Sequence, residues 1–352
     1  MDSLHLLYLL YGGNTVYRQE AKFTILSALR EQRVPGSFTI TLMTDEPQAF
    51  EGWPVNVIPL STDILTEWKG ANGYTHRRKA CAIAAGVLLA EKTIFVDTDT
   101  VFFKDPATLF ERVTDQQYLM DEFEWTWAEA KLRADYVPFS NELIAKGKAP
   151  DDGLKLYNSG ICGIARVNAG VMDKAIELID EWSDHYLRLH TIEQIAVSFA
   201  MGDAKVVTAN DCIHHYYSKK RYHHTMNKGF FDKFGEQYHA DLPTLSATVP
   251  VFFPQPSLLA KIKAQPRLIA VEKAFRPAAK LMIQGGKVST VDYLRRYCRD
   301  ALWRRAIELL HQKHATTRQI EHLTKICIEP SQQADFKALL SQHAEQTRRN
   351  QL

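Results

Sequence analysis

Two aspartates with one residue between them, Asp97 and Asp99, follow the apolar run "KTIFV" and precede a second run, "TVFF". A buried strand that ends in two carboxylates brings like charges together, which is costly unless a cation neutralises them. Hard divalent cations such as Mg²⁺ or Mn²⁺ prefer oxygen ligands and keep positions open for substrate phosphates. The pair therefore predicts a divalent-cation site. The alternative is two solvated aspartates in a turn, where this residue is common.

The segments before this pair alternate between strand and helix patterns. Predicted strands cover 4–11, 38–45, 55–60 and 92–97, and predicted helices cover 16–32 and 75–91. Repeated βα units predict an α/β fold with a mostly parallel sheet flanked by helices. Ligands of such sheets bind at the carboxyl ends of the strands. We therefore expect Tyr11, Gly12 and Asp45 to lie at the same edge as Asp97 and Asp99 and to contact the same ligand.

The middle of the chain contains a long excursion, 121–156, without clear periodicity. Long excursions in compact domains are often lids or binding loops. Its Trp125 and Trp127 could stack on a sugar ring or pack internally. Further predicted elements are a strand at 157–167, helices at 169–189 and 191–202, a strand at 204–209 and a polar, His-rich loop at 211–224.

From about Pro254 the chain becomes helical and basic. It contains 18 Lys+Arg and 8 Asp+Glu from Ser257 onward, although the whole chain has a net charge of only +2. We predict a catalytic domain at 1–255 and a basic helical extension at 256–352. The arginine-rich helix from Arg295 to Arg305 suits a membrane surface, a partner protein or a solvated helix face. Nucleic acid is not expected, because the sequence shows no binding motif and the basic residues are confined to the tail.

Composition places the 352 residues among ordinary globular proteins, with 45% hydrophobic and 24% charged residues. No apolar run reaches the roughly 18 residues that a membrane span needs. The N-terminal sequence lacks a basic leading region and a cleavage site, so we expect a cytoplasmic protein, with peripheral membrane contact through its tail as an option. The five cysteines form no CxxC pair, which predicts reduced thiols.

The segment "KTIFVDTDTVFFKDP" resembles the Asp-x-Asp segment of GT-A nucleotide-sugar glycosyltransferases, above all the group of glycogenin and bacterial lipopolysaccharide sugar transferases. The likeness extends over roughly residues 5–220 and includes "YGGNTVYRQ", "HRRKACAI", "YNSGICGIARVN", "IEQIAV" and "CIHHYYSKK". It implies a GT-A-like fold and transfer of a sugar from a nucleotide diphosphate, with UDP favoured, to a hydroxyl group of a glycan. It also implies a bound Mn²⁺ or Mg²⁺ and favours retention of anomeric configuration.

The resemblance also implies roles for individual residues. Donor contacts fall on Tyr17, Lys79, Asp97, Thr98, Asp99 and Lys219, with Arg77 and Lys220 as further phosphate candidates, and catalytic or sugar contacts fall on Asn158, Gly160, Glu193 and Gln194. The metal ligands would be Asp97, Asp99 and His214, which is favoured over His215 because it follows the apolar Ile213. Two departures are visible: Glu193 stands where the group has Asp, and the group's His-x-x-Gly-x-x-Lys-Pro-Trp ending is absent.

Two other functions fit parts of the pattern. Phosphatases of the haloacid dehalogenase kind also place Asp-x-Asp after an apolar strand, but near the N-terminus and with Thr where this chain has Val101. A binding protein for nucleotide-sugars or glycans would keep the same residues without turnover. Asp121, Glu122, Asp151 and Asp152 are candidate acid–base or acceptor contacts, or solvated loop charges.

Overall fold

A computed structural model describes residues 3–183, 189–288 and 290–349 of the chain. The end of the helix predicted at 169–189 falls partly outside these residues. The chain forms two compact units. The first contains residues up to Tyr217 together with Glu236–Ser246, and the second contains Ser218–Gly235 together with the chain from Ala247 onward.

The first unit is built around a seven-stranded sheet with the order β10-β6-β9-β4-β1-β2-β3. The strands are β1 (Leu4–Leu10), β2 (Thr39–Thr44), β3 (Asn56–Pro59), β4 (Lys92–Val96), β6 (Gln117–Met120), β9 (Ile161–Ala165) and β10 (Lys205–Thr208). All neighbouring pairs are parallel except those of β9, which runs antiparallel to both β4 and β6. The predicted mostly parallel sheet is confirmed.

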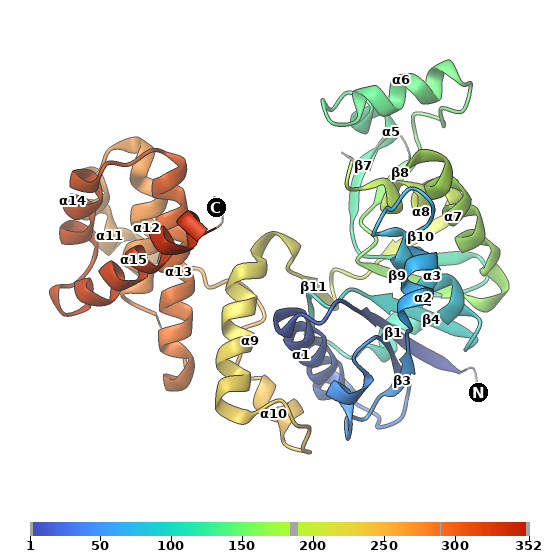
Figure 1. Cartoon of the computed structure of the whole chain (residues 1–352), viewed down its shortest axis with the longest axis horizontal. Helices are drawn as coiled ribbons and strands as arrows, with labels where there is room; N and C mark the ends of the chain where they lie inside the picture. Colours follow the sequence, from blue (N-terminus) through green and yellow to red (C-terminus); the bar gives the residue numbers. More distant parts are fainter. Residues whose placement is uncertain (1–2, 184–188, 289, 350–352) are drawn as a thin grey trace. The chain divides into compact units, whose positions relative to one another are not determined.

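Helices cover both faces of this sheet, and Figure 1 shows α1 and α3 on opposite sides of its strands. The helices of this unit are α1 (Thr15–Glu31), α2 (Thr62–Trp68), α3 (Arg77–Val87), α4 (Ala107–Phe110), α5 (Trp127–Ala130), α6 (Val137–Ala145), α7 (Gly170–Trp182), α8 (Ile192–Met201) and α10 (Leu242–Ser246). On the α3 side, Leu7 packs so closely that a Cβ at Gly86 would lie 2.2 Å from it. Both faces of β1 are therefore buried, which explains its continuous apolar run.

The excursion at 121–156 is folded rather than irregular. It contains β7 (Phe123–Thr126), which pairs with β8 (Lys155–Tyr157), and the short helices α5 and α6. These elements are too short to show periodicity in the sequence. Trp127 is 1% exposed and packs against the rings of Phe139 and Phe199, so internal packing is the correct interpretation for this residue.

The prediction of a His-rich loop at 211–224 is wrong. Its first part is β11 (Ile213–His215), which pairs with β5 (Thr100–Phe102), and its last part begins α9 (Lys220–Phe234). Buried residues of α9 recur at Tyr222, Met226 and Phe230, one turn apart. The interspersed histidines and lysines mask this spacing in the sequence.

The second unit is helical, which confirms the predicted helical extension. Besides α9 it contains α11 (Leu258–Ile269), α12 (Arg276–Gly285), α13 (Asp292–Gln312), α14 (Thr317–Cys327) and α15 (Gln333–Arg349). Trp303 fills its core, donates its indole N–H to the carbonyl of Met282 at 3.0 Å and packs against Gly285. The compact units differ from the predicted boundary at 255, because α9 groups with these helices; a Cβ at its Gly229 would lie 2.7 Å from Tyr297 of α13.

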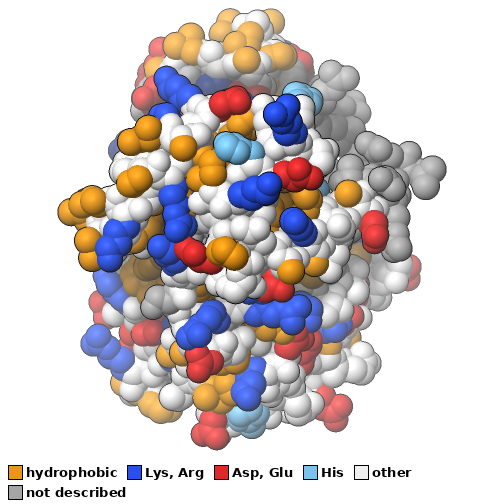
Figure 2. Space-filling model, turned by 90° about the vertical axis from the view of Figure 1, so that its left-hand side faces the viewer, with side chains coloured by type: hydrophobic (Ala, Val, Ile, Leu, Met, Phe, Trp, Pro, Cys, Tyr) orange, Lys and Arg blue, Asp and Glu red, His pale blue; other side chains and the backbone are white. Residues whose placement is uncertain are grey.

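Basic residues of the tail are visible on the face shown in Figure 2, where Lys and Arg side chains lie among hydrophobic ones. Within the described part of the chain, no helix is both long enough and apolar enough to span a membrane.

His5 of β1 makes the stability of the first unit depend on pH. It is 3% exposed, and burial lowers its pKa from 6.5 to about 4, against the opposing hydrogen bond to the Gly86 carbonyl. The unfolded chain therefore binds an extra proton between these values, and stability is lost as the pH falls through this window. We expect His5 to make the protein about 2 kcal/mol less stable at pH 5 than at pH 7.

Urea unfolding of the wild type and of His5→Gln at both pH values checks this prediction. The difference between the two proteins isolates His5 from the carboxylates that also titrate. Equal pH dependence in both proteins would contradict the prediction.

Candidate active site

The parallel strands bring several polar residues to one edge of the sheet. The backbone N–H of Gly12, just after β1, donates to the Asp45 carboxylate, just after β2, at 3.0 Å. Asp97 follows β4, and its backbone N–H donates to the carbonyl of Gly160 at 2.7 Å. Gly160 lies at this edge because β9 runs in the opposite direction and begins where its neighbours end. The predicted clustering of Gly12, Asp45 and Asp97 at the strand ends is observed.

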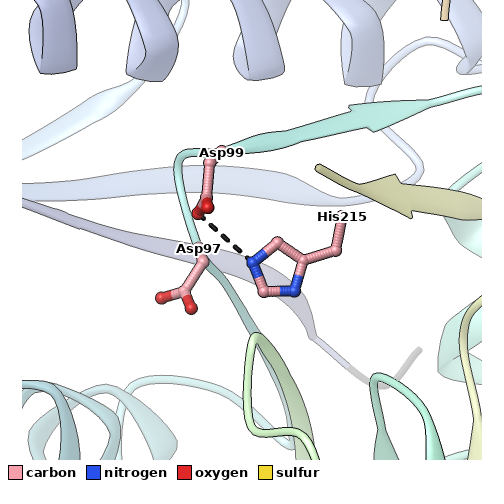
Figure 3. A group of neighbouring side chains, drawn as sticks. All are labelled: Asp97, Asp99 and His215. Carbon is pink, nitrogen blue, oxygen red and sulfur yellow. Dashed lines mark ion pairs between the residues drawn. The ribbon is translucent and has the colours of Figure 1, made fainter. Parts of the chain in front are cut away.

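Three side chains at this edge form a group with the composition of a metal site. Ligand atoms of Asp97, Asp99 and His215 all lie within 4.8 Å of one another. Figure 3 shows His215 facing Asp99, with Asp97 beside them, and the Nε2 of His215 lies 3.3 Å from Oδ1 of Asp99. His215 reaches this position through strand pairing, because β11 runs beside β5 and places His215 opposite Thr100.

The histidine of this group is His215, whereas the sequence analysis favoured its neighbour His214. Successive side chains of a strand point to opposite faces. His215 therefore shares the face of the buried Ile213, while the half-buried His214 points the other way and lies 6.4 Å from the ring of Tyr216. The alternation from Ile213 was a usable signal in the sequence, but only once 213–215 is recognised as a strand.

Asp121 holds the other ring nitrogen of this histidine. Its Oδ2 lies 2.5 Å from the Nδ1 of His215, and its side chain is only 3% exposed. Burial lowers the pKa of His215, but the hydrogen bonds to Asp121 and Asp99 outweigh it and raise the pKa to about 10. Metal-binding histidines commonly have such a carboxylate at their second nitrogen, which fixes the ring and directs the first nitrogen to the metal. From the sequence, Asp121 is a candidate acid–base or acceptor contact or a solvated loop charge, and nothing there predicts its pairing with a histidine.

Gly160 completes the pocket around the imidazole. A Cβ at this position would lie 2.2 Å from Cε1 of His215 and 3.1 Å from Oδ2 of Asp121. Atoms this close cannot coexist, so only glycine allows the ring to occupy its observed place.

Lys79 of α3 supplies the positive charge of the site. Its Nζ lies 3.1 Å from Oδ2 of Asp97, 3.1 Å from Oγ of Ser159 and 3.6 Å from Oε2 of Glu193. Burial lowers the pKa of Lys79, but Asp97 and Glu193 outweigh it and hold the pKa above its usual range. Lys79 is therefore a fixed ammonium group beside the carboxylate pair.

Glu193 is buried next to Lys79. It is 5% exposed and accepts a hydrogen bond from Ser159 Oγ at 2.8 Å. Burial raises its pKa, and Lys79 acts in the opposite direction. This placement gives Glu193 a positioning role toward Lys79.

A second network joins the two predicted amide residues. Oε1 of Glu124 accepts from Nδ2 of Asn158 at 3.1 Å, and its Oε2 accepts from Nε2 of Gln194 at 2.7 Å. Burial raises the pKa of Glu124, while both amides lower it. The amide oxygen of Asn158 accepts from the backbone N–H of Gly160, so this network touches the histidine pocket. Nothing in "DEFEWTWAEA" distinguishes Glu124 from its acidic neighbours, so the sequence does not predict it as a site residue.

The other residues predicted to contact the donor differ in their neighbours and in their exposure. The ring of Tyr11 lies 4.8 Å from the Arg78 guanidinium, Tyr17 is 44% exposed and Thr98 is half-buried. Arg77 pairs with Asp180 of α7 at 2.6 Å and so joins two helices, and its contact with a phosphate stays a prediction.

The remaining charged candidates are two lysines and two loop aspartates. Lys219 and Lys220 belong to the second unit, so their phosphate contacts stay predictions. Asp152 pairs with Lys131, and Asp151 accepts from the backbone N–H of Gly153, as expected of loop charges.

Comparison with known proteins gives structural likenesses only. No protein-family model matches the chain, and no curated protein is a significant match. Similar solved structures include mouse xyloside xylosyltransferase 1 in its apo form, with 13% identity and a TM-score of 0.39, over 59% of this chain and 85% of that one. They also include the galactosyltransferase LgtC in complex with donor and acceptor sugar analogues, with 10% identity and a TM-score of 0.39, over 58% of this chain and 73% of that one. Similarity at this level carries neither the activity nor the substrates of these two proteins over to this chain.

Proposed function

We propose that this protein is a metal-dependent glycosyltransferase. It would move a sugar from a nucleotide diphosphate, with UDP-sugars favoured, to a hydroxyl group of a glycan acceptor. The observation that supports this most is the convergence of Asp97, Asp99 and His215 at the carboxyl ends of parallel strands, where such sheets bind ligands.

The charges of the site fit a divalent cation. Four carboxyl groups, from Asp97, Asp99, Asp121 and Glu193, lie together here, and the cationic groups seen to pair with them are Lys79 and His215. Two carboxylate oxygens and one imidazole nitrogen suit Mn²⁺ or Mg²⁺, which Asp97, Asp99 and His215 would hold. When bound, the cation polarises the oxygens of a diphosphate and lowers the energy of its departure.

Lys79 would stabilise the same leaving group. A fixed charge aimed at the place where negative charge develops contributes most when it does not have to reorganise. Asp97, Ser159 and Glu193 hold the ammonium in position before any ligand arrives. Charge growing on the diphosphate would then be met by a cation that is already in place.

The amides of Asn158 and Gln194 would contact the sugar. Glu124 accepts one N–H from each, which fixes how both side chains are turned and leaves their remaining donors and the Gln194 oxygen for hydroxyl groups. Retention of anomeric configuration is the finer part of the proposal, and it is motivated by the sequence resemblance alone.

Calorimetric titration of UDP with and without Mn²⁺ tests the proposal. We expect binding that requires the metal, followed by release of UDP from one member of a panel of sugar nucleotides when glycan acceptors are added. Metal-dependent UDP binding without transfer to any acceptor would instead support a binding protein. No binding of UDP, GDP, CMP or ADP, together with phosphate release from p-nitrophenyl phosphate, would support the phosphatase alternative.

Glu124→Gln should lower kcat by about 10–100-fold while leaving Mn²⁺ affinity unchanged. A glutamine can accept only one of the two amide N–H groups and turns its own N–H₂ toward the other, so one of Asn158 and Gln194 loses its orientation. Steady-state kinetics and Mn²⁺ titration measure the two quantities separately.

Glu177→Gln on the exposed surface of α7 is the matched control and should behave as the wild type. An unchanged kcat in Glu124→Gln would exclude the proposed role of this network.

A further inference from the structure

The second unit contains a large groove that the proposed sugar transfer does not use. It has a volume of about 1010 Å³ and is lined by residues of α11, α12, α13 and the segment before α11. Ligand pockets are typically about 300–1,000 Å³ and mostly apolar. Apolar lining residues include Leu259, Ala264, Leu268, Leu281, Ile283 and Leu302. The groove is thus large enough for a hydrocarbon chain.

The polar lining of the groove carries one sign of charge. It contains Lys261, Lys263, Arg267, Lys280 and Lys287, and no Asp or Glu. Arg267 pairs with Glu329 at 2.9 Å, whereas none of the four lysines is ion-paired among the described residues. Clustered cations over a low-dielectric wall attract an anion. A ligand that contacts both the apolar and the basic lining residues would therefore be an amphiphile with a negatively charged head.

The outer side of α11 is also apolar. Leu258, Ile262 and Ile269 are 75%, 58% and 73% exposed and follow one another at i, i+4 and i+11, which places them on one stripe of the helix. Lys261 and Lys263 flank this stripe. An exposed apolar stripe between lysines is typical of helices that lie in a lipid surface.

We propose that this groove binds the acyl chain of an anionic lipid, with the headgroup phosphate held by its lysines. The outer stripe of α11 enters the surrounding lipid surface. Charge complementarity selects an anion, and the apolar volume selects a lipid over an acidic peptide, whose side chains would leave the hydrocarbon-lined part empty. This proposal is independent of the proposed sugar transfer, because every residue that it uses lies in the second unit.

Titration of the full-length protein with dihexanoyl phosphatidylglycerol, below its micelle concentration, tests the groove directly. We expect saturable binding, and binding at least about tenfold weaker to dihexanoyl phosphatidylcholine and to inorganic phosphate. Equal binding of the two lipids would overturn the role of the lysines. Inorganic phosphate binding as tightly as the anionic lipid would show a free-anion site instead, and tighter binding of hexaglutamate would favour a protein partner.

Variants distinguish lipid binding in the groove from attraction of lipid to general surface charge. Ala264→Trp fills the groove without a charge change, and Leu259→Asp alters a lining residue that is 60% exposed and so leaves the core intact. Both should weaken lipid binding at least about tenfold, as should the double change Lys261→Glu with Lys280→Glu. The matched control, Arg318→Glu with Lys325→Glu on the exposed surface of α14, should bind as the wild type.

Cosedimentation with phosphatidylcholine vesicles that contain phosphatidylglycerol extends the test to a surface. Circular dichroism confirms that each variant is folded. Lipid binding that survives Ala264→Trp and Leu259→Asp, and is lost only on charge reversal, would show surface electrostatics and overturn the groove as the site.

Discussion

Asp99→Asn is expected to remove metal-dependent UDP binding and to lower kcat/KM by about 10²–10³-fold, the loss found when one preorganised electrostatic group is removed from an active site. The asparagine has nearly the same shape, so the change removes a charge and little else. Asp99 is 5% exposed, and its Oδ1 lies 3.3 Å from Nε2 of His215. Without this carboxylate, a divalent cation in the proposed site would have a weaker oxygen ligand and less negative charge to attract it.

The measurement is a calorimetric titration of UDP at saturating Mn²⁺, followed by kinetics with the donor found in the screen. Asp105→Asn is a suitable control, because Asp105 is also buried but accepts from the backbone N–H of Ala107 at the start of α4. It should cost stability and leave metal-dependent binding intact. Mn²⁺-dependent UDP binding that persists in Asp99→Asn would remove the basis of the proposed function.

The sheet and its ligand edge could be predicted because the signals are local. An apolar run that ends in Asp97-Thr-Asp99 is visible in the sequence, and alternating βα patterns place such an end at the ligand edge of a parallel sheet. The structure places both aspartates there. The same reasoning located Gly12 and Asp45, which are joined by a hydrogen bond.

The partners of these residues could not be predicted, because they depend on contacts between distant segments. His215 meets Asp99 through the register of β11 against β5, and Asp121 reaches the same ring from the end of β6. A one-residue difference in register exchanges His214 for His215. Likewise, Glu124 matters only because Asn158 and Gln194, 34 and 70 residues away, converge on its carboxylate.

The prediction at 211–224 failed for a different reason. Histidine and lysine are typical of polar loops, but long side chains can also lie along a buried face, and His223 is only 1% exposed. The helix α9 is recognisable only when Tyr222, Met226 and Phe230 are considered without the residues between them.

Gly160→Ala should lower Mn²⁺ affinity by about 10–100-fold, as expected when the group that orients a metal-binding histidine is disturbed. The added Cβ would lie 2.2 Å from Cε1 of His215 and 2.3 Å from its Nδ1, so the ring must leave its place between Asp99 and Asp121 or the start of β9 must shift. Overpacking of this kind also costs about 1–3 kcal/mol of stability.

Substitutions of two further glycines separate the effect on Mn²⁺ affinity from the effect on stability. A Cβ at Gly170 would meet nothing within 4 Å, so Gly170→Ala should leave both stability and Mn²⁺ affinity unchanged. A Cβ at Gly163 would lie 2.7 Å from Val113 and 2.8 Å from Leu119, in the core, so Gly163→Ala should lose stability while the folded protein keeps its Mn²⁺ affinity. If Gly160→Ala bound Mn²⁺ as Gly163→Ala does, its effect would be one of packing alone, and the place of His215 in the metal group would have to be abandoned. If only Gly160→Ala lost the metal, the close approach of this glycine to the imidazole would be what holds the third ligand beside Asp97 and Asp99.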